Sequence, residues 1–113
     1  FPEVWYEPFG IAIIESMYYG CPVFGTPYGS LPEIVSPEVG FLSAKKAELV
    51  AKLPEADAYH RKDCHERVMD MFTVKQMTDK YLTYYEKVMN GETLNPKEPQ
   101  HQYDPDEKNL PFD

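Results

Sequence analysis

The segment spanning residues 10–43 constrains the fold of this chain most strongly. Residues 11–17 carry apolar side chains around most of a helix, which is typical of a helix buried in a larger body. Gly20 is placed to end that helix, and short apolar runs at 21–25 and 40–43 lie between turn residues, as buried parallel strands do. The order helix, strand, Gly-rich loop, strand therefore predicts a doubly wound α/β domain.

Two glutamates, Glu7 and Glu15, bracket seven uncharged residues at the start of this segment. A helix that begins near Gly10 points free backbone N–H groups and the positive end of its dipole at an incoming anion. Glycine lets a phosphate approach the backbone closely because it has no Cβ. Glu15 lies four residues past Ile11, roughly 6 Å further along the axis, where a carboxylate can accept hydrogen bonds from a ribose diol. The pattern predicts a phosphate site with Glu7 near a sugar beyond it; the alternative is two structural glutamates, exposed or ion-paired.

The loop after the first predicted strand is a second place where a ligand is expected. Ligands of doubly wound sheets bind at the carboxyl ends of strands, and Tyr28, Gly29 and Ser30 directly follow such an end. We therefore treat these three residues as possible loop contacts to the ligand, with an ordinary turn as the alternative. Residues 31–35 are expected to form a single helical turn.

Four motifs, in their order along the chain, resemble the retaining glycosyltransferases of the group-1 (family 4) class. They are Glu7-Pro8-Phe9-Gly10-Ile11 through Glu15, Gly20-Cys21-Pro22-Val23, Thr26-Pro27-Tyr28-Gly29 and Pro32-Glu33-Ile34-Val35. The resemblance covers about positions 1 to 90. It implies the GT-B arrangement, in which two Rossmann-like domains face each other across a cleft. Residues 1–91 then correspond to the C-terminal half of the nucleotide-sugar-binding domain.

The resemblance also implies roles for individual residues. The family residue that matches Glu7 contacts hydroxyls of the donor sugar and shapes the reacting site, and the one that matches Glu15 binds the ribose. The backbone amides of Phe9, Gly10 and Ile11 correspond to those that bind the donor phosphates. The implied reaction transfers a sugar from a nucleotide-diphosphate sugar to an acceptor hydroxyl with retention of configuration. It uses neither a metal nor a cofactor apart from this substrate.

Two further positions bear on the resemblance. Glu33 matches a family position, and we expect it to be structural, capping or pairing near the loop. The family often has a Gly-Gly pair where this chain has Gly29-Ser30, a difference that is small in volume.

Several parts of the implied enzyme lie outside this chain. The first 44 residues contain no Lys or Arg, whereas in the family an Arg/Lys pair upstream of the position of Phe1 neutralises the diphosphate. The N-terminal acceptor domain and the first strands of the donor domain are also absent. We therefore expect a fragment of a longer enzyme that is inactive alone. The alternative is a non-catalytic interaction or regulatory module with a degenerate glycosyltransferase fold.

Composition excludes some partners. The net charge of −8 argues against nucleic acid or anionic lipid as a partner of this segment. Two cysteines give no disulfide framework, which fits a reduced, cytoplasmic setting. No apolar run is long enough to span a membrane.

Two helices are expected in the next part of the chain, at 45–53, ended by Pro54, and at about 57–71. The second carries His60, Cys64 and His65. His60 and Cys64 share a helix face, but His65 is turned away by roughly 100°. Two ligands on one exposed helix do not make a metal site, so none is expected.

The last helix has clear local signals. Thr73 and Gln76 form a capping box, and Asn90-Gly91 ends the helix. An apolar stripe repeats at helical spacing, formed by Met77, Tyr81, Tyr84, Tyr85 and Val88. In the resembled family such a helix crosses back towards the N-terminal domain; without that partner, the stripe is expected to drive self-association.

From residue 92 to 113 the chain is acidic and Pro-rich and has no apolar period. It is expected to be a disordered or loosely docked tail. Tyr103, Leu110 and Phe112 are the residues that could anchor it against a groove.

Overall fold

The computed structural model describes residues 1–98, 100 and 109–113. Its first part contains two short strands and two helices in alternation: α1 (Ile11–Tyr18), β1 (Val23–Gly25), α2 (Leu31–Ile34) and β2 (Gly40–Leu42). The strands pair in parallel, with Val23 opposite Gly40 and Gly25 opposite Leu42. A parallel pair whose strands are joined through a helix confirms the predicted α/β arrangement.

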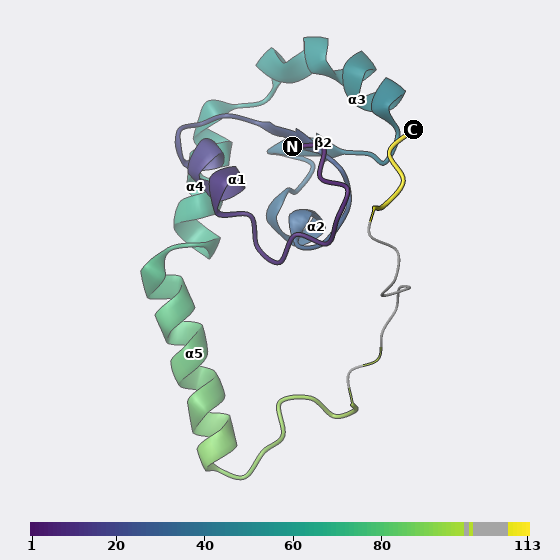
Figure 1. The fold of residues 1–113 in the computed structure, drawn as a ribbon. Helices are drawn as coiled ribbons and strands as arrows, with labels where there is room; N and C mark the ends of the chain where they lie inside the picture. The colour runs from purple at the N-terminus through teal and green to yellow at the C-terminus, as the bar shows by residue number, and fades with distance from the viewer. Residues whose placement is uncertain (99, 101–108) are drawn as a thin grey trace.

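The second part is helical (Figure 1). It contains α3 (Lys46–Lys52), the 3-10 helix η1 (Leu53–Ala58), α4 (Arg61–Met71) and α5 (Val74–Met89). Helix α3 ends at Lys52, just before Pro54, as predicted, and Pro54 lies in the first turn of η1, where its missing N–H is not needed. The helix expected from residue 57 begins only at Arg61, because Tyr59 and His60 are extended and separate η1 from α4.

Helix α1 is held between two glycines. Gly10 precedes it in the left-handed region (φ 78°), and Gly20 follows it with φ 80°. The N–H of Gly20 donates to the carbonyl of Met17 at 2.8 Å, and that of Cys21 donates to the carbonyl of Ser16 at 3.1 Å. These two bonds form a Schellman motif, so the predicted start and end of the helix are both confirmed.

The core lies between α1, the two strands and α4. Its buried apolar residues are Ile13, Met17, Val23, Leu31, Ile34, Val35, Val39, Cys64 and Val68. Only one face of α1 enters this core: Ile13 and Met17 are buried, but Ile11 is 64% exposed and Ala12 is exposed. The expectation that α1 is buried nearly all round is therefore wrong for this chain, because no described residue covers its second face.

Helix α5 carries no buried residue and extends away from the sheet (Figure 1). Its N-terminus is capped as predicted, because Thr73 Oγ1 accepts a hydrogen bond from the N–H of Gln76 at 3.2 Å. The five residues of its apolar stripe are between 47% and 58% exposed. No described helix is both long and apolar enough to cross a membrane.

The end of the chain returns to the α/β part. Leu110 is buried, and its N–H donates to the carbonyl of Val4 at 2.7 Å. Asp113 donates its N–H to the carbonyl of Ala44 at 3.2 Å. Phe112 lines an apolar groove beside α3. Of the three anchors considered for the tail, Leu110 and Phe112 thus contact the body, and Tyr103 lies outside the described residues.

Candidate functional site

Two loops meet at the carboxyl end of β1, and their backbones touch. The N–H of Ser30 donates to the carbonyl of Glu7 at 2.9 Å. Gly29 has φ 58°, and a Cβ at this position would overlap the backbone N and O of Glu7. Only glycine combines this backbone angle with so close an approach. The loop after β1 therefore fixes the position of Glu7.

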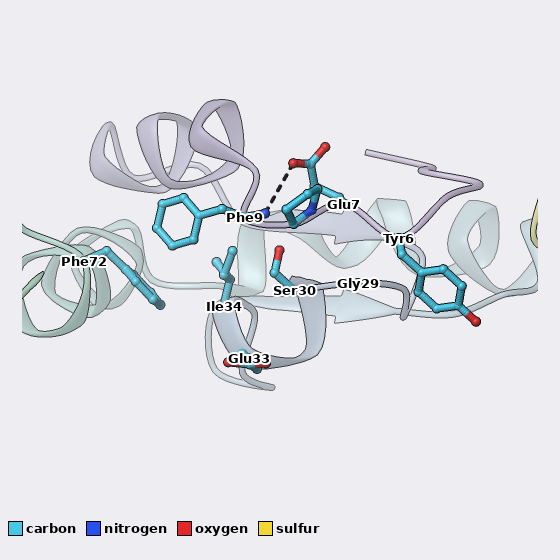
Figure 2. Close-up of a pocket in the computed structure, with 9 residues that line it drawn as sticks. Tyr6, Glu7, Phe9, Gly29, Ser30, Glu33, Ile34 and Phe72 are labelled. Atoms are coloured by element: carbon cyan, nitrogen blue, oxygen red, sulfur yellow. Dashed lines mark hydrogen bonds between the residues drawn. The ribbon is translucent and has the colours of Figure 1, made fainter. Parts of the chain in front are cut away.

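The Glu7 side chain folds back over its own loop (Figure 2). Its Oε1 accepts hydrogen bonds from the N–H groups of Phe9, at 3.3 Å, and Gly10, at 3.0 Å. These are two of the three amides that the family resemblance assigns to the donor phosphates. In this structure a carboxylate of the protein occupies them.

The next two amides of the chain lie at the start of α1. The N–H groups of Ile11 and Ala12 have no acceptor among the described residues, whereas the carbonyl of Gly10 accepts from the following turn. Such unpaired N–H groups, together with the helix dipole, attract anions. Glu15 lies one turn further on the same exposed face as Ile11, and its side chain is exposed.

A pocket of about 390 Å³ opens between the two loops and the end of α4 (Figure 2). Its lining consists of Tyr6, Glu7, Pro8, Phe9, Gly29, Ser30, Glu33, Ile34 and Phe72. The pocket therefore brings together four of the eight residues singled out from the sequence: Glu7, Phe9, Gly29 and Ser30. Gly10, Ile11, Glu15 and Tyr28 are not part of this lining.

Phe72 is the pocket residue that the sequence analysis missed. Its ring packs edge-to-face on Phe9 with the ring centroids 6.2 Å apart. The contact arises because α4 runs antiparallel to α1: Arg61, at the start of α4, bonds the carbonyl of Tyr19 after α1, and the end of α4 lies beside the start of α1. No local pattern around Phe72 indicates such a contact.

Arg67 brings a positive charge close to the pocket, and two of its five N–H donors bind carbonyls of α2. Its Nε donates to the carbonyl of Ile34 at 3.2 Å, and its Nη2 donates to the carbonyl of Glu33 at 2.9 Å. The guanidinium also lies 6.0 Å from the centroid of the Phe72 ring. Arg67 thus caps the C-terminal end of α2. The Glu33 carboxylate is exposed and lies on the side of α2 away from Glu7 (Figure 2).

Two residues of the loop after β1 differ in their surroundings. The Tyr28 hydroxyl donates to the carbonyl of Pro111 at 2.6 Å, and its ring packs edge-to-face on Tyr6. The Ser30 hydroxyl is buried and has no hydrogen-bond partner among the described residues. It points towards the Glu7–Phe9 segment (Figure 2).

The residues considered for a metal site are separated in the structure. Cys64 is fully buried, and burial raises the pKa of its thiol. His65 places Nδ1 2.6 Å from the carbonyl of Tyr18 and stacks on its ring. His60 is exposed at the start of α4. Within the described part of the chain, no three His, Cys, Asp or Glu side chains are grouped to hold a metal ion.

Comparison with known proteins identifies the family of the chain. The family described as "Glycosyl transferases group 1" matches residues 1–67, which include both loops, α1 and the two strands. A probable sucrose-phosphate synthase from Thermosipho melanesiensis is 36% identical over 86 residues, which is 73% of this chain and 20% of that protein. The chain thus spans about a fifth of the length of this curated relative. It belongs to the group 1 glycosyltransferases and contains part of their α/β domain.

Proposed function

We propose that this chain supplies part of the donor site of a retaining glycosyltransferase that uses a nucleotide-diphosphate sugar. The observation that carries the proposal is the pair of unpaired N–H groups, on Ile11 and Ala12, at the start of α1. Together with the amides of Phe9 and Gly10, they offer a diphosphate several donors along one loop and the positive end of a helix.

The two glutamates flank these amides on opposite sides. Glu7 lies in the preceding loop, at the pocket, where it can accept hydrogen bonds from the hydroxyls of the donor sugar. Glu15 lies one turn along the exposed face of α1, which suits a ribose attached to the far phosphate. The acceptor hydroxyl then attacks from the face that the diphosphate leaves, and the backbone donors stabilise the charge that develops on the leaving group.

Backbone amides alone do not neutralise a diphosphate. Residues 1–44 hold no Lys or Arg, and the guanidinium of Arg67 is bonded to the carbonyls of Glu33 and Ile34. We therefore propose that the cations, the acceptor site and the covering for the exposed face of α1 come from other parts of a longer enzyme. On this proposal the present chain does not transfer sugar by itself.

Two substitutions in the full-length enzyme test the proposal. Glu15→Ala is expected to raise the dissociation constant of the nucleotide sugar by roughly 10- to 100-fold, the equivalent of a hydrogen bond to a charged group. Glu7→Ala is expected to lower the transfer rate by about 100-fold and to change the affinity for the donor much less, since its contacts serve the reacting sugar. Calorimetry gives the affinities, and initial rates give the transfer.

Glu38→Gln, a change at an exposed residue outside the pocket lining, is the control for a general effect of charge. Wild-type transfer rates in both test variants would contradict the donor-site assignment. Such rates would favour the second candidate function, an interaction module. In it Glu7 only stabilises its own loop, by accepting hydrogen bonds from the N–H groups of Phe9 and Gly10. A thermal-shift comparison of UDP-, GDP- and ADP-sugars then identifies the nucleotide.

We also propose that the apolar stripe of α5 associates with a second copy when residues 1–113 are studied alone. The stripe is half exposed and α5 has no buried residue, so its burial against another copy is favourable. The average mass in sedimentation is expected to rise with concentration. Tyr81→Glu combined with Tyr85→Glu should abolish the rise, whereas Thr83→Glu on another face should not. A strict monomer at high concentration would contradict the proposal.

A further inference from the structure

The Glu7 carboxylate and a diphosphate need the same hydrogen-bond donors. Oε1 of Glu7 accepts from the N–H groups of both Phe9 and Gly10, at 3.3 and 3.0 Å. Each backbone amide has a single hydrogen to donate. A phosphate oxygen that binds these amides at full strength must therefore displace the carboxylate, because two anions cannot share the donors without repulsion.

We propose that Glu7 is an internal competitor of the donor diphosphate, so that binding of the phosphates releases its carboxylate towards the sugar. This inference rests on the proposed donor site and adds a mechanism to it. In the free enzyme the carboxylate satisfies two amides that would otherwise be unpaired. When the diphosphate binds, the same N–H groups donate to phosphate oxygens instead of the carboxylate. The Glu7 side chain can then accept hydrogen bonds from the hydroxyls of the donor sugar.

The surroundings of Glu7 allow a side-chain movement with little movement of the backbone. Gly29 packs against its N and O atoms, and Ser30 donates to its carbonyl, so the main chain of Glu7 is held in place. Its side chain, in contrast, is only half-buried, forms hydrogen bonds to just these two amides among the described residues, and lines an open pocket. Rotation about the side-chain bonds can therefore move the carboxylate from the amides into the pocket.

The exchange also has a consequence after transfer. Once the sugar has left, Glu7 loses the hydroxyls that held it on the pocket side. Its carboxylate then competes again for the amides of Phe9 and Gly10 and weakens the binding of the nucleoside diphosphate. Glu7 would thus promote product release, a step that limits the turnover of many enzymes.

Affinity for a nucleoside diphosphate without a sugar tests this inference in the full-length enzyme. The probes are UDP, GDP and ADP, and the one that binds the wild-type enzyme most tightly is used for the variants. Glu7→Ala is expected to bind it roughly tenfold more tightly, the equivalent of one hydrogen bond to a charged group. Glu7→Gln should show a smaller gain, because a neutral amide oxygen is a weaker competitor. Isothermal calorimetry measures both.

Two variants separate competition for the amides from a general loss of negative charge. Glu7→Asp keeps a carboxylate that can accept from the N–H groups two and three residues on, as Asp does in local turns, so its affinity should stay near that of the wild type. Glu33→Gln removes a charge from a residue that lines the pocket but whose carboxylate lies on the side of α2 away from these amides, and we expect less than a twofold change.

The outcomes distinguish this inference from the proposed function. If none of the three diphosphates binds the wild-type enzyme, the donor site itself is wrong. If one of them binds but Glu7→Ala binds it equally or more weakly, only the competition is wrong. An equal gain in Glu33→Gln would also overturn the competition, since it would show that charge alone accounts for the effect.

Discussion

Replacing Gly29 by alanine is expected to destabilise the protein by about 2–4 kcal/mol and to lower sugar transfer at least tenfold. The residue has φ 58°, and an added Cβ would overlap the backbone N and O of Glu7. The atoms in the way are main-chain atoms, so no side-chain rotation removes the clash. The loop after β1 must instead move, and this movement changes the contacts of Gly29 and Ser30 that hold the main chain of Glu7. Denaturant unfolding and initial transfer rates in the full-length enzyme measure the two effects.

Gly91→Ala is the matched control for this substitution. Gly91 has φ 81°, but no described atom lies within 4 Å of an added Cβ, so alanine at this position has the backbone strain without the clash. We expect a cost of about 1 kcal/mol and normal transfer. If Gly29→Ala changed stability and transfer as little as Gly91→Ala, the loop would accommodate the methyl group by moving at little cost. Gly29 would then not position Glu7.

Gly40→Ala is expected to have the largest effect on folding, a loss of about 3 kcal/mol or more. Gly40 pairs with Val23 in the parallel ladder, and an added Cβ would overlap the carbonyl oxygen of Val23 and lie 2.7 Å from Cγ1 of Val35. Both neighbours belong to the core. The strands must separate to admit one methyl group, and domains have only roughly 5–15 kcal/mol of stability in total.

The loss should appear as a lower denaturant midpoint and as faster hydrogen exchange of the amides of β1 and β2. Gly91→Ala again provides the comparison, because it changes the same residue type at an open position. Slow exchange in these strands, combined with an unchanged midpoint, would show that the strand pair accommodates the methyl group and would contradict the prediction.

The sequence predicted the elements whose signals are local. Gly10 and Gly20 set the ends of α1 through their own backbone angles, and Thr73 caps α5 through the N–H of Gln76. Each of these signals acts within a turn of the helix it ends. Helix α4 starts later than predicted, because no local sequence signal indicates that Tyr59 is extended after η1.

The composition of the pocket could be predicted only in part. Phe9 and Phe72 meet because α1 and α4 pack antiparallel, and Arg67 joins α4 to the end of α2. Such contacts depend on the packing of the whole domain. The bond from Glu7 to the amide of Phe9 is local, however, and a carboxylate two residues before a free N–H could have indicated it.

Ser30 and Gly29 are neighbours in the site, but they differ in how well the structure tolerates their substitution. The Ser30 hydroxyl has no hydrogen-bond partner among the described residues. Replacement by alanine or glycine therefore loses no hydrogen bond of this side chain and removes the free-energy cost of a buried, unsatisfied polar atom. The side chain at this position can therefore change without loss of a hydrogen bond to the described residues. Its neighbour Gly29 cannot be replaced in this way, because any side chain would overlap the main chain of Glu7.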